Sequence, residues 1–237
     1  MSKAINILCT RKLDAKVLKK AELNNIHINC VPFIETIFTQ SSDVENKVKE
    51  LETQEIVAVF TSKKAVEGVI GLLTTVPNWK IFCTGGITKN SIIKYFGEDH
   101  IVESGKHASD VKQKILKRKS SILKVYFFCG DQRMNDIPES LPTQGIQVEE
   151  MVVYKTILLP QYIDKDYDGI MFFSPSAAHS YFSENTLPTE TPLFSIGNTT
   201  TATIKTYSAN PIITSEWPGQ ESLANLVIQH FSNLINV

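Results

Sequence analysis

The stretch VFTSKKAV, Val59–Val66, decides the fold, because it has a counterpart 112 residues further on in MFFSPSAA, Met171–Ala178. At the same offset IFCTGGITKNSI, Ile81–Ile92, falls on LFSIGNTTTATI, Leu193–Ile204. Each segment combines a short apolar run, a turn of small residues and the start of a helical pattern. Because sequence that repeats at a constant offset indicates a repeated structural unit, we expect two similar halves rather than a single sheet.

The rest of the chain follows the same rhythm. Short runs rich in Val, Ile and Phe alternate with amphipathic stretches of helical period, which is typical of an α/β fold with mostly parallel sheets. The predicted strands are Ile5–Thr10, Ile56–Phe60, Lys80–Thr84, Leu123–Cys129, Gly169–Phe173, Leu193–Ile196 and Pro211–Thr214. Between the first two, Ser42 and Glu45 have the spacing of a capping box at a helix start.

Two extended, β-branched segments break this rhythm, one from Cys30 to Phe38 and one from Val148 to Leu159. If they pair as a two-stranded ribbon, the chain leaves one half near Phe33 and returns near Thr156. The expected organisation is then a discontinuous α/β domain of residues 1–32 and 157–237, an inserted α/β domain of residues 36–153, and a linker ribbon of residues 33–35 and 154–156.

The bulk composition excludes several classes of partner. With 24 Lys and Arg against 25 Asp and Glu, the net charge of -1 provides no global basic field for nucleic acid. An anionic partner must be held by local groups instead. The sequence shows neither a signal peptide nor an apolar stretch of membrane-spanning length, so we expect a soluble, cytoplasmic protein. The cysteines form no CxxC pair and lie in or beside strand-like runs, which predicts reduced core thiols.

Small hydroxyl and glycine residues follow the predicted strands. Because parallel strands end at a common edge, these turns are expected at the carboxyl edge of a sheet, where helix N-termini favour carboxylates or phosphates. The alternative is ordinary helix capping. The turns are Thr61-Ser62, Gly85–Thr88, Gly130-Asp131, Ser174-Pro175-Ser176 and Gly197-Asn198-Thr199-Thr200, and the basic residues near turns are Arg11, Lys12, Lys63, Lys64, Arg133 and Lys155.

Common catalytic and cofactor motifs are missing from the sequence. No GxxxxGK[ST] or GxGxxG motif supports nucleotide binding, and the histidines show no metal-ligand spacing, so no metal site is expected. Nothing groups a Ser or Cys nucleophile with a His base and an acid. Tyr154 stands at the end of the apolar run MVVY, where it is either an exposed phenol or a half-buried aromatic on a sheet.

The ordered set VFTSKKAV, FFCGDQRMNDIPESL, GIQVEEMVVYKT, DGIMFFSPSAAHSYF, SIGNTTTATI and GQESLANLVI resembles the uroporphyrinogen-III synthase family. The likeness runs from about Ile56 to the C-terminus. It is weaker in the first fifty residues, where ILCTRK and VPFIET carry it.

This resemblance implies two α/β domains joined by a two-stranded ribbon, with the active-site cleft between them. It implies a monomeric lyase without metal or organic cofactor that closes hydroxymethylbilane, a linear tetrapyrrole octacarboxylate, with loss of water and inversion of ring D. Tyr154 occupies the position of the family's tyrosine, a candidate proton donor. The turns around Ser62, Ser174–Ser176 and Gly197–Thr200 would hold the substrate's carboxylates.

Two other classes of function remain open at this point. A hinged binding module would close two lobes on a small anion without chemistry. A two-domain glycosyltransferase would share the paired α/β architecture, but it requires a nucleotide-sugar site in the C-terminal half, and no such motif is present.

Overall fold

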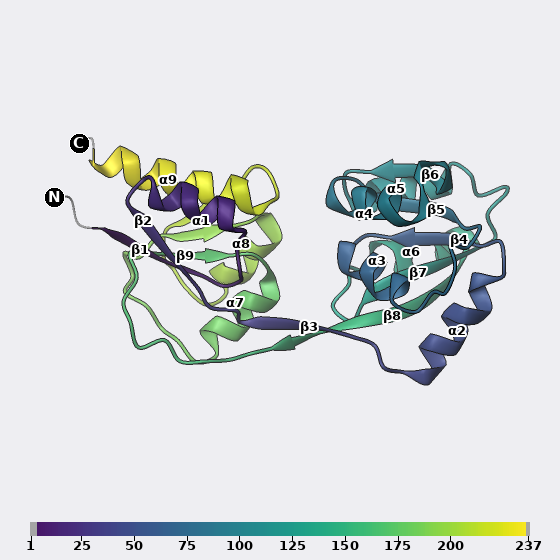
Figure 1. Ribbon diagram of the computed structural model, residues 1–237, viewed down its shortest axis with the longest axis horizontal. Coiled ribbons are helices and arrows are strands. Elements are labelled where there is room, and N and C mark those ends of the chain that lie inside the picture. The colour runs from purple at the N-terminus through teal and green to yellow at the C-terminus, as the bar shows by residue number, and fades with distance from the viewer. Residues whose placement is uncertain (1–3, 236–237) are drawn as a thin grey trace. The chain divides into compact units, whose positions relative to one another are not determined.

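The computed structural model describes residues 4–235, which fall into two compact units (Figure 1). The first unit contains the described residues up to Glu35 and those from Ile157 on, and the second is Thr36–Thr156. Each unit has its own mostly parallel sheet with helices on both faces. The predicted α/β fold class is therefore confirmed.

The sheet of the second unit has the strand order β3-β8-β7-β4-β5-β6. From β8 to β6 every neighbouring pair is parallel. At the edge, β3 runs antiparallel to β8, since the Thr39 amide donates to the Val153 carbonyl and the Leu159 amide donates to the Phe33 carbonyl. The strands are β3 Ile34–Phe38, β4 Val57–Phe60, β5 Lys80–Thr84, β6 Ile101–Gly105, β7 Lys124–Gly130 and β8 Gln147–Leu158.

Helices cover both faces of this second sheet. On one face lie α2 Ser42–Glu52, α3 Lys63–Ile70 and α4 Ile87–Phe96, and on the other lie α5 Ala108–Leu116 and α6 Asp136–Ser140. Short 3-10 turns occupy Glu98–His100 and Pro142–Gln144. The predicted capping box at Ser42 is wrong, because α2 is preceded by Ser41 and its first turn has no side-chain cap.

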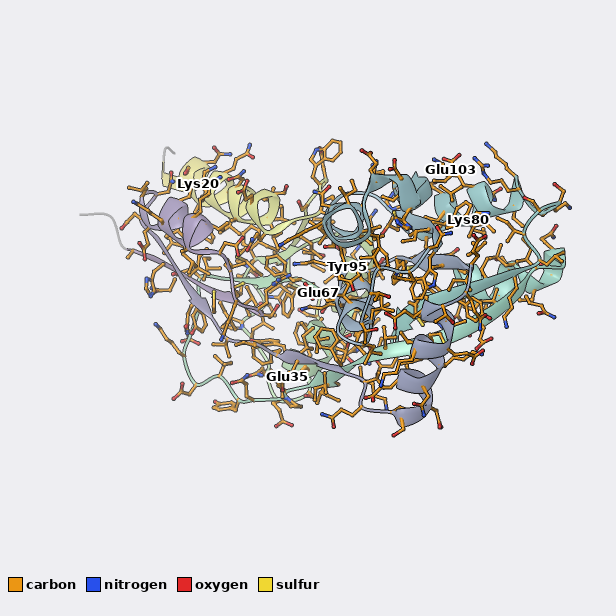
Figure 2. The ribbon with its side chains drawn as sticks, turned by 45° about the vertical axis from the view of Figure 1, so that its right-hand side comes forward. Lys20, Glu35, Glu67, Lys80, Tyr95 and Glu103 are labelled. Carbon is orange, nitrogen blue, oxygen red and sulfur yellow. The ribbon has the colours of Figure 1, made fainter. Side chains whose placement is uncertain are left out.

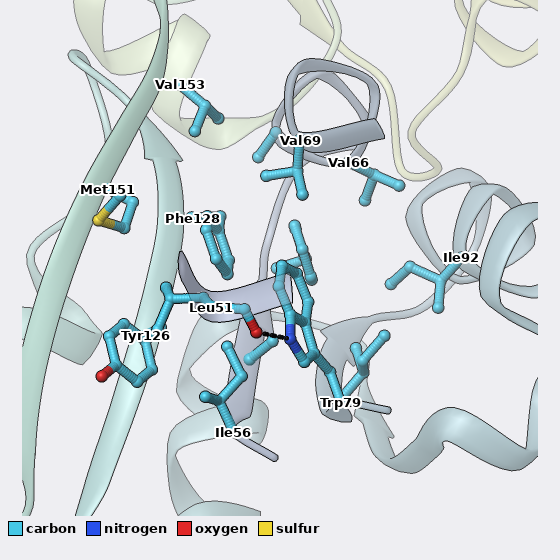
Figure 3. Close-up of a cluster of buried hydrophobic side chains, with 14 of the residues drawn as sticks. Leu51, Ile56, Val66, Val69, Trp79, Ile92, Tyr126, Phe128, Met151 and Val153 are labelled. Atoms are coloured by element: carbon cyan, nitrogen blue, oxygen red, sulfur yellow. Dashed lines mark hydrogen bonds between the residues drawn. The ribbon is translucent and has the colours of Figure 1, made fainter. Parts of the chain in front are cut away.

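The core beneath α3 and α4 is built around Trp79 (Figure 3). Its ring stacks on Phe128 with centroids 5.3 Å apart, and its indole N–H donates to the Leu51 carbonyl at 2.9 Å. A buried indole requires such a partner, because an unpaired N–H in an apolar core is costly. This contact fixes the end of α2 against the sheet.

The first unit has a parallel sheet of order β11-β10-β9-β1-β2. Helices α1 Ala15–Glu22 and α9 Gln220–Ile235 cover one face, and α7 Pro175–Phe182 and α8 Asn198–Lys205 cover the other. The strands are β1 Ile5–Cys9, β2 Ile26–Cys30, β9 Gly169–Phe172, β10 Leu193–Ser195 and β11 Ile212–Thr214.

The repeat found in the sequence is a repeat of structure. Strand β4 and helix α3 lie at an offset of 112 residues from β9 and α7, with the same lengths. The sheet order also corresponds, with β7 and β8 of the second unit matched by β1 and β2 of the first. The two units therefore share one architecture, although the matching strands come in a different chain order.

Each sheet has one point at which the strand order reverses. It lies between β4 and β7 in the second unit, and between β9 and β1 in the first. In open parallel sheets, ligands bind outside the carboxyl ends of the strands at this point. The turns that follow these four strands are therefore the expected position of a ligand-binding site.

Candidate active site

Tyr154 lies at the carboxyl edge of the second unit's sheet and contacts the turn after β4. Its hydroxyl donates a hydrogen bond to the Ser62 hydroxyl, with 3.1 Å between the two oxygens. Ser62 also caps α3, since its Oγ accepts from the Lys64 amide at 3.1 Å. A phenol and a helix N-terminus therefore meet at the reversal point of the strand order.

A bulge in β8 directs the tyrosine toward α3. Cys129 pairs with Val152, but Gly130 pairs with Tyr154, so Val153 is the extra residue. Both Val153 and Tyr154 contact the core beneath α3, whereas regular alternation places consecutive side chains on opposite faces. Bulges often re-aim a side chain beside an active site in this way.

Gly130 provides the space that the Tyr154 ring occupies. A Cβ atom at position 130 would overlap Cε2 and Cζ of the ring and lie 2.8 Å from its hydroxyl oxygen. The backbone of β8 is fixed by Asp131, whose amide donates to the Tyr154 carbonyl at 3.2 Å and whose carboxylate accepts from the Thr156 amide at 3.0 Å. Ser62 thus holds the phenol hydroxyl, and Asp131 holds the backbone of the strand that carries it.

Burial raises the pKa of the Tyr154 phenol above its ordinary value, and the hydrogen bond with Ser62 offsets part of that shift. The phenol is therefore fully protonated at neutral pH. A proton donor must hold its proton until the moment of transfer, and this group does so.

The basic residues of this edge are largely paired with acids. Lys63 and Lys64 lie 3.1 and 2.8 Å from the Glu67 carboxylate on the same helix. Arg133 bonds to the Glu150 carboxylate and to the Asn135 side chain at 2.6 Å. These cations retain exposed surface, but each must share its charge with an acid to bind a further anion.

Beside these lysines, α3 and α4 line an open groove with a volume of about 540 Å³. Figure 2 shows Glu67 and Tyr95 on the two helices that form it. In the first unit the residues at the corresponding offset, His179 and Tyr207, are joined by a hydrogen bond of 2.6 Å, and Phe182 stacks on Tyr207. Aromatic side chains thus cover that face of the first unit.

The first unit presents its own turns at the equivalent edge. Ser174 caps α7 by accepting from the Ala177 amide at 3.1 Å, while Pro175 and Ser176 form the first turn of that helix. On the neighbouring β1 loop, the Arg11 guanidinium stacks over the Phe173 ring at 5.3 Å. This edge therefore combines a helix N-terminus with a cation.

The turn after β10 is only partly accessible. Gly197 precedes α8 and is half-buried, Thr199 is exposed in the first turn, and Thr200 is buried with 2% of its surface exposed. The Thr200 hydroxyl therefore faces the interior of the unit. Of this predicted carboxylate-binding turn, the backbone around Gly197 and the side chains of Asn198 and Thr199 remain accessible.

Among residues 4–235, no group of three or more His, Cys, Asp and Glu is arranged to hold a metal ion. Within the same described part of the chain, no helix is long and apolar enough to cross a membrane.

A comparison with protein-family models matches residues 16–225 to the model described as uroporphyrinogen-III synthase HemD. The chain belongs to the uroporphyrinogen-III synthase family. The family is one of lyases in tetrapyrrole biosynthesis. A comparison with curated protein sequences gave no match.

Solved structures of uroporphyrinogen III synthases share the fold. A mutant enzyme from the extremely thermophilic bacterium Thermus thermophilus matches with a TM-score of 0.66 at 12% identity, covering 98% of this chain and 99% of that one. The Helicobacter pylori enzyme matches with a TM-score of 0.62 at 16% identity, covering 95% and 99%. At these identities the likeness concerns the fold.

Within this uroporphyrinogen-III synthase family member, sequence reasoning missed the contacts that position Tyr154. It treated Gly130-Asp131 as one of the substrate-binding turns and did not connect either residue with Tyr154. The signal was present in the adjacency of Gly130 and Asp131 at the end of a buried strand. Their partner in β8, however, became known only from the register of the sheet.

Proposed function

We propose that this protein catalyses the closure of hydroxymethylbilane to uroporphyrinogen III, with loss of water and inversion of ring D. The observation that carries this proposal is the half-buried, protonated phenol of Tyr154, held by Ser62 beside a helix N-terminus at the carboxyl edge of the sheet. A site of this kind offers a proton and a favourable environment for carboxylates in one place.

Tyr154 acts as the general acid in the first step. The lone pair of the terminal pyrrole nitrogen expels the hydroxyl group from the adjacent methylene, the carbon–oxygen bond breaks, and the phenol proton leaves with the oxygen as water. Ring D attacks the resulting azafulvene cation with its already substituted α-carbon, which forms a spiro intermediate. The older bond from that carbon to the methylene of ring C then breaks and leaves an azafulvene on ring C. The free α-carbon of ring D attacks that methylene, which inverts ring D and closes the macrocycle. The proton lost when the last pyrrole regains its aromaticity restores the phenol.

The substrate's carboxylates bind at helix N-termini. Ser62, Ser174 and Gly197 directly precede α3, α7 and α8. The free backbone N–H groups in the first turn of each helix carry partial positive charge. Thr61, Lys63, Gly130 and Arg133 line the edge of the second unit, and Pro175, Ser176, Thr199 and Thr200 belong to the turns of the first. Because several groups share the binding, no single carboxylate contact is expected to be indispensable.

We further infer that the protein works as a cytoplasmic monomer on this small molecule, without a metal or organic cofactor. Neither the departure of water nor the ring closure needs redox or group-transfer chemistry. Dialysis against EDTA is expected to leave turnover unchanged, and light scattering of the active protein is expected to give the mass of one chain. A loss of activity that one specific metal restores contradicts the first expectation.

The decisive experiment supplies freshly made hydroxymethylbilane and identifies the isomer formed. Spontaneous closure gives the unrearranged type I product, so formation of the type III isomer establishes catalysis. A binding module or a glycosyltransferase would leave only the type I product, and that outcome rejects the proposal.

A further inference from the structure

Two cysteines of the first unit lie side by side on neighbouring strands. Cys9 ends β1, Cys30 ends β2, and the two are direct partners in the parallel register. Both side chains contact the core on the α1 and α9 face of the sheet. The pair is therefore a dithiol, although the two residues are far apart in sequence.

The spacing suits a reversible disulfide. Adjacent strands lie about 4.8 Å apart, which falls within the range of about 4.4–6.8 Å that Cα atoms span in disulfides. Because in-register side chains of parallel strands point the same way, their Cβ atoms are expected at about the same 4.8 Å, and a disulfide must draw them to about 3.8 Å, which strains the bond. Strained disulfides are the more easily reduced ones.

The two thiols have different environments. Cys9 is fully buried and its S–H donates to the Arg11 carbonyl at 3.1 Å, whereas Cys30 is half-buried. The neighbouring Cys9 side chain lowers the pKa of the Cys30 thiol, and the Leu13 backbone adds to this shift. Burial raises the pKa of the Cys9 thiol. Cys30 is thus the more acidic and more accessible thiol of the pair.

We propose that Cys30 and Cys9 form a peroxide-sensitive pair, in which Cys30 reacts first and Cys9 resolves the product into a disulfide. The Cys30 thiolate attacks one peroxide oxygen, the O–O bond breaks, and the departing hydroxide takes a proton to become water. Cys9 sulfur then attacks the sulfenic sulfur of Cys30, the S–O bond breaks, and the Cys9 proton leaves with that oxygen as a second water. Two thiols lose two electrons, and one hydrogen peroxide yields two waters.

The other cysteines serve as internal controls. Burial raises the pKa of Cys83 to about 11 and that of Cys129 to about 12. Both belong to the second unit, and the structure records no thiol partner for either among the described residues. They are expected to remain reduced when the pair reacts.

The test treats the folded full-length protein with limited hydrogen peroxide, alkylates the remaining thiols after unfolding, and maps the products. Cleavage after Lys and Arg places Cys9 in residues 4–11 and Cys30 in residues 21–47, so a disulfide links two distinct peptides. We expect this linked pair to form at least about tenfold faster than any oxidation of Cys83 or Cys129, because reaction rate follows thiolate content and access. Equal reactivity of all four cysteines overturns the proposal.

Two variants separate the steps. In Cys9→Ser, Cys30 is expected to accumulate as sulfenic acid, which a 1,3-diketone traps. In Cys30→Ser, Cys9 is expected to stay reduced, because it is buried and lacks the reactive partner. Oxidation of Cys9 at the wild-type rate in Cys30→Ser contradicts the assigned order. Wild-type mapping decides the proposal even if a variant fails to fold.

Discussion

The hydroxyl of Tyr154 donates to the hydroxyl of Ser62, which lies 92 residues earlier in the chain and caps helix α3. The strand that carries the proposed acid is thereby joined to a helix N-terminus suited to the substrate's carboxylates. A change at either residue should therefore affect both proton donation and the position of the phenol.

Tyr154→Phe removes only the phenol oxygen. Because general acid catalysis typically contributes about a hundredfold or more, we expect turnover to the type III isomer to fall by about that factor. Unfolding free energy should change by only about 1 kcal/mol, the usual net value of one hydrogen bond. Tyr95→Phe on α4 is the matched control, and near wild-type turnover of Tyr154→Phe would mean that the tyrosine only packs.

Gly130→Ala is expected to displace the Tyr154 ring, because the added Cβ would overlap it. Turnover should fall nearly as far as in Tyr154→Phe, and the double variant should be little worse than either single one, since both remove the same proton donation. Gly71→Ala is the control, since a Cβ there meets its nearest atom at 3.6 Å. Additive losses in the double variant would show that Gly130 acts independently of the phenol.

Ser62→Ala and Ser174→Ala form a pair defined by the repeat. Both remove a helix cap, so each should cost about 1 kcal/mol in thermal or denaturant unfolding. Ser62→Ala alone also removes the partner of Tyr154 and is expected to lower type III turnover more than Ser174→Ala does. Equal turnover of the two variants, with equal stability, argues against a role for the Ser62 contact in positioning.

The raised pKa of Tyr154 has a defined effect on pH dependence. The folded protein holds this proton to higher pH than the unfolded chain does. Its contribution to stability is therefore complete below about pH 10, the pKa of tyrosine in an unfolded chain, and is lost as the pH rises through the pKa of the folded state. The difference in phenolate absorbance between wild type and Tyr154→Phe should thus appear only above about pH 10. Ser62→Ala should move it further up, because Ser62 lowers this pKa.

The repeat made the fold predictable from sequence. The pairs Val59–Val66 and Met171–Ala178 contain the ends of β4 and β9 and the starts of α3 and α7, so one offset located both units. Two strands were missed, β2 Ile26–Cys30 and β6 Ile101–Gly105. Each lies at the edge of its parallel ladder, and β2 alternates with polar residues while β6 ends in Glu-Ser-Gly, so neither has the continuous apolar run of a central strand.

The site was less predictable than the fold. Tyr154 and Ser62 were both candidates, but their contact depends on the bulge at Val153, which no local pattern in MVVY indicates. Arg133 was expected to offer free charge, whereas it is paired with Glu150. Pairing between residues far apart in sequence is set by register and packing, which hydrophobic periodicity does not specify.

The insertion of one unit within the other has a consequence for synthesis on the ribosome. Strand β1 needs β9 on one side, yet β9 begins at Gly169, after the whole of Thr36–Thr156 has been made. At about 5–20 residues per second, β1, α1 and β2 wait roughly seven to thirty seconds with one strand edge unpaired. The inserted unit can thus fold first. Until β9 is made, the segment Ile5–Cys30 exposes an unpaired strand edge of the kind that chaperones bind.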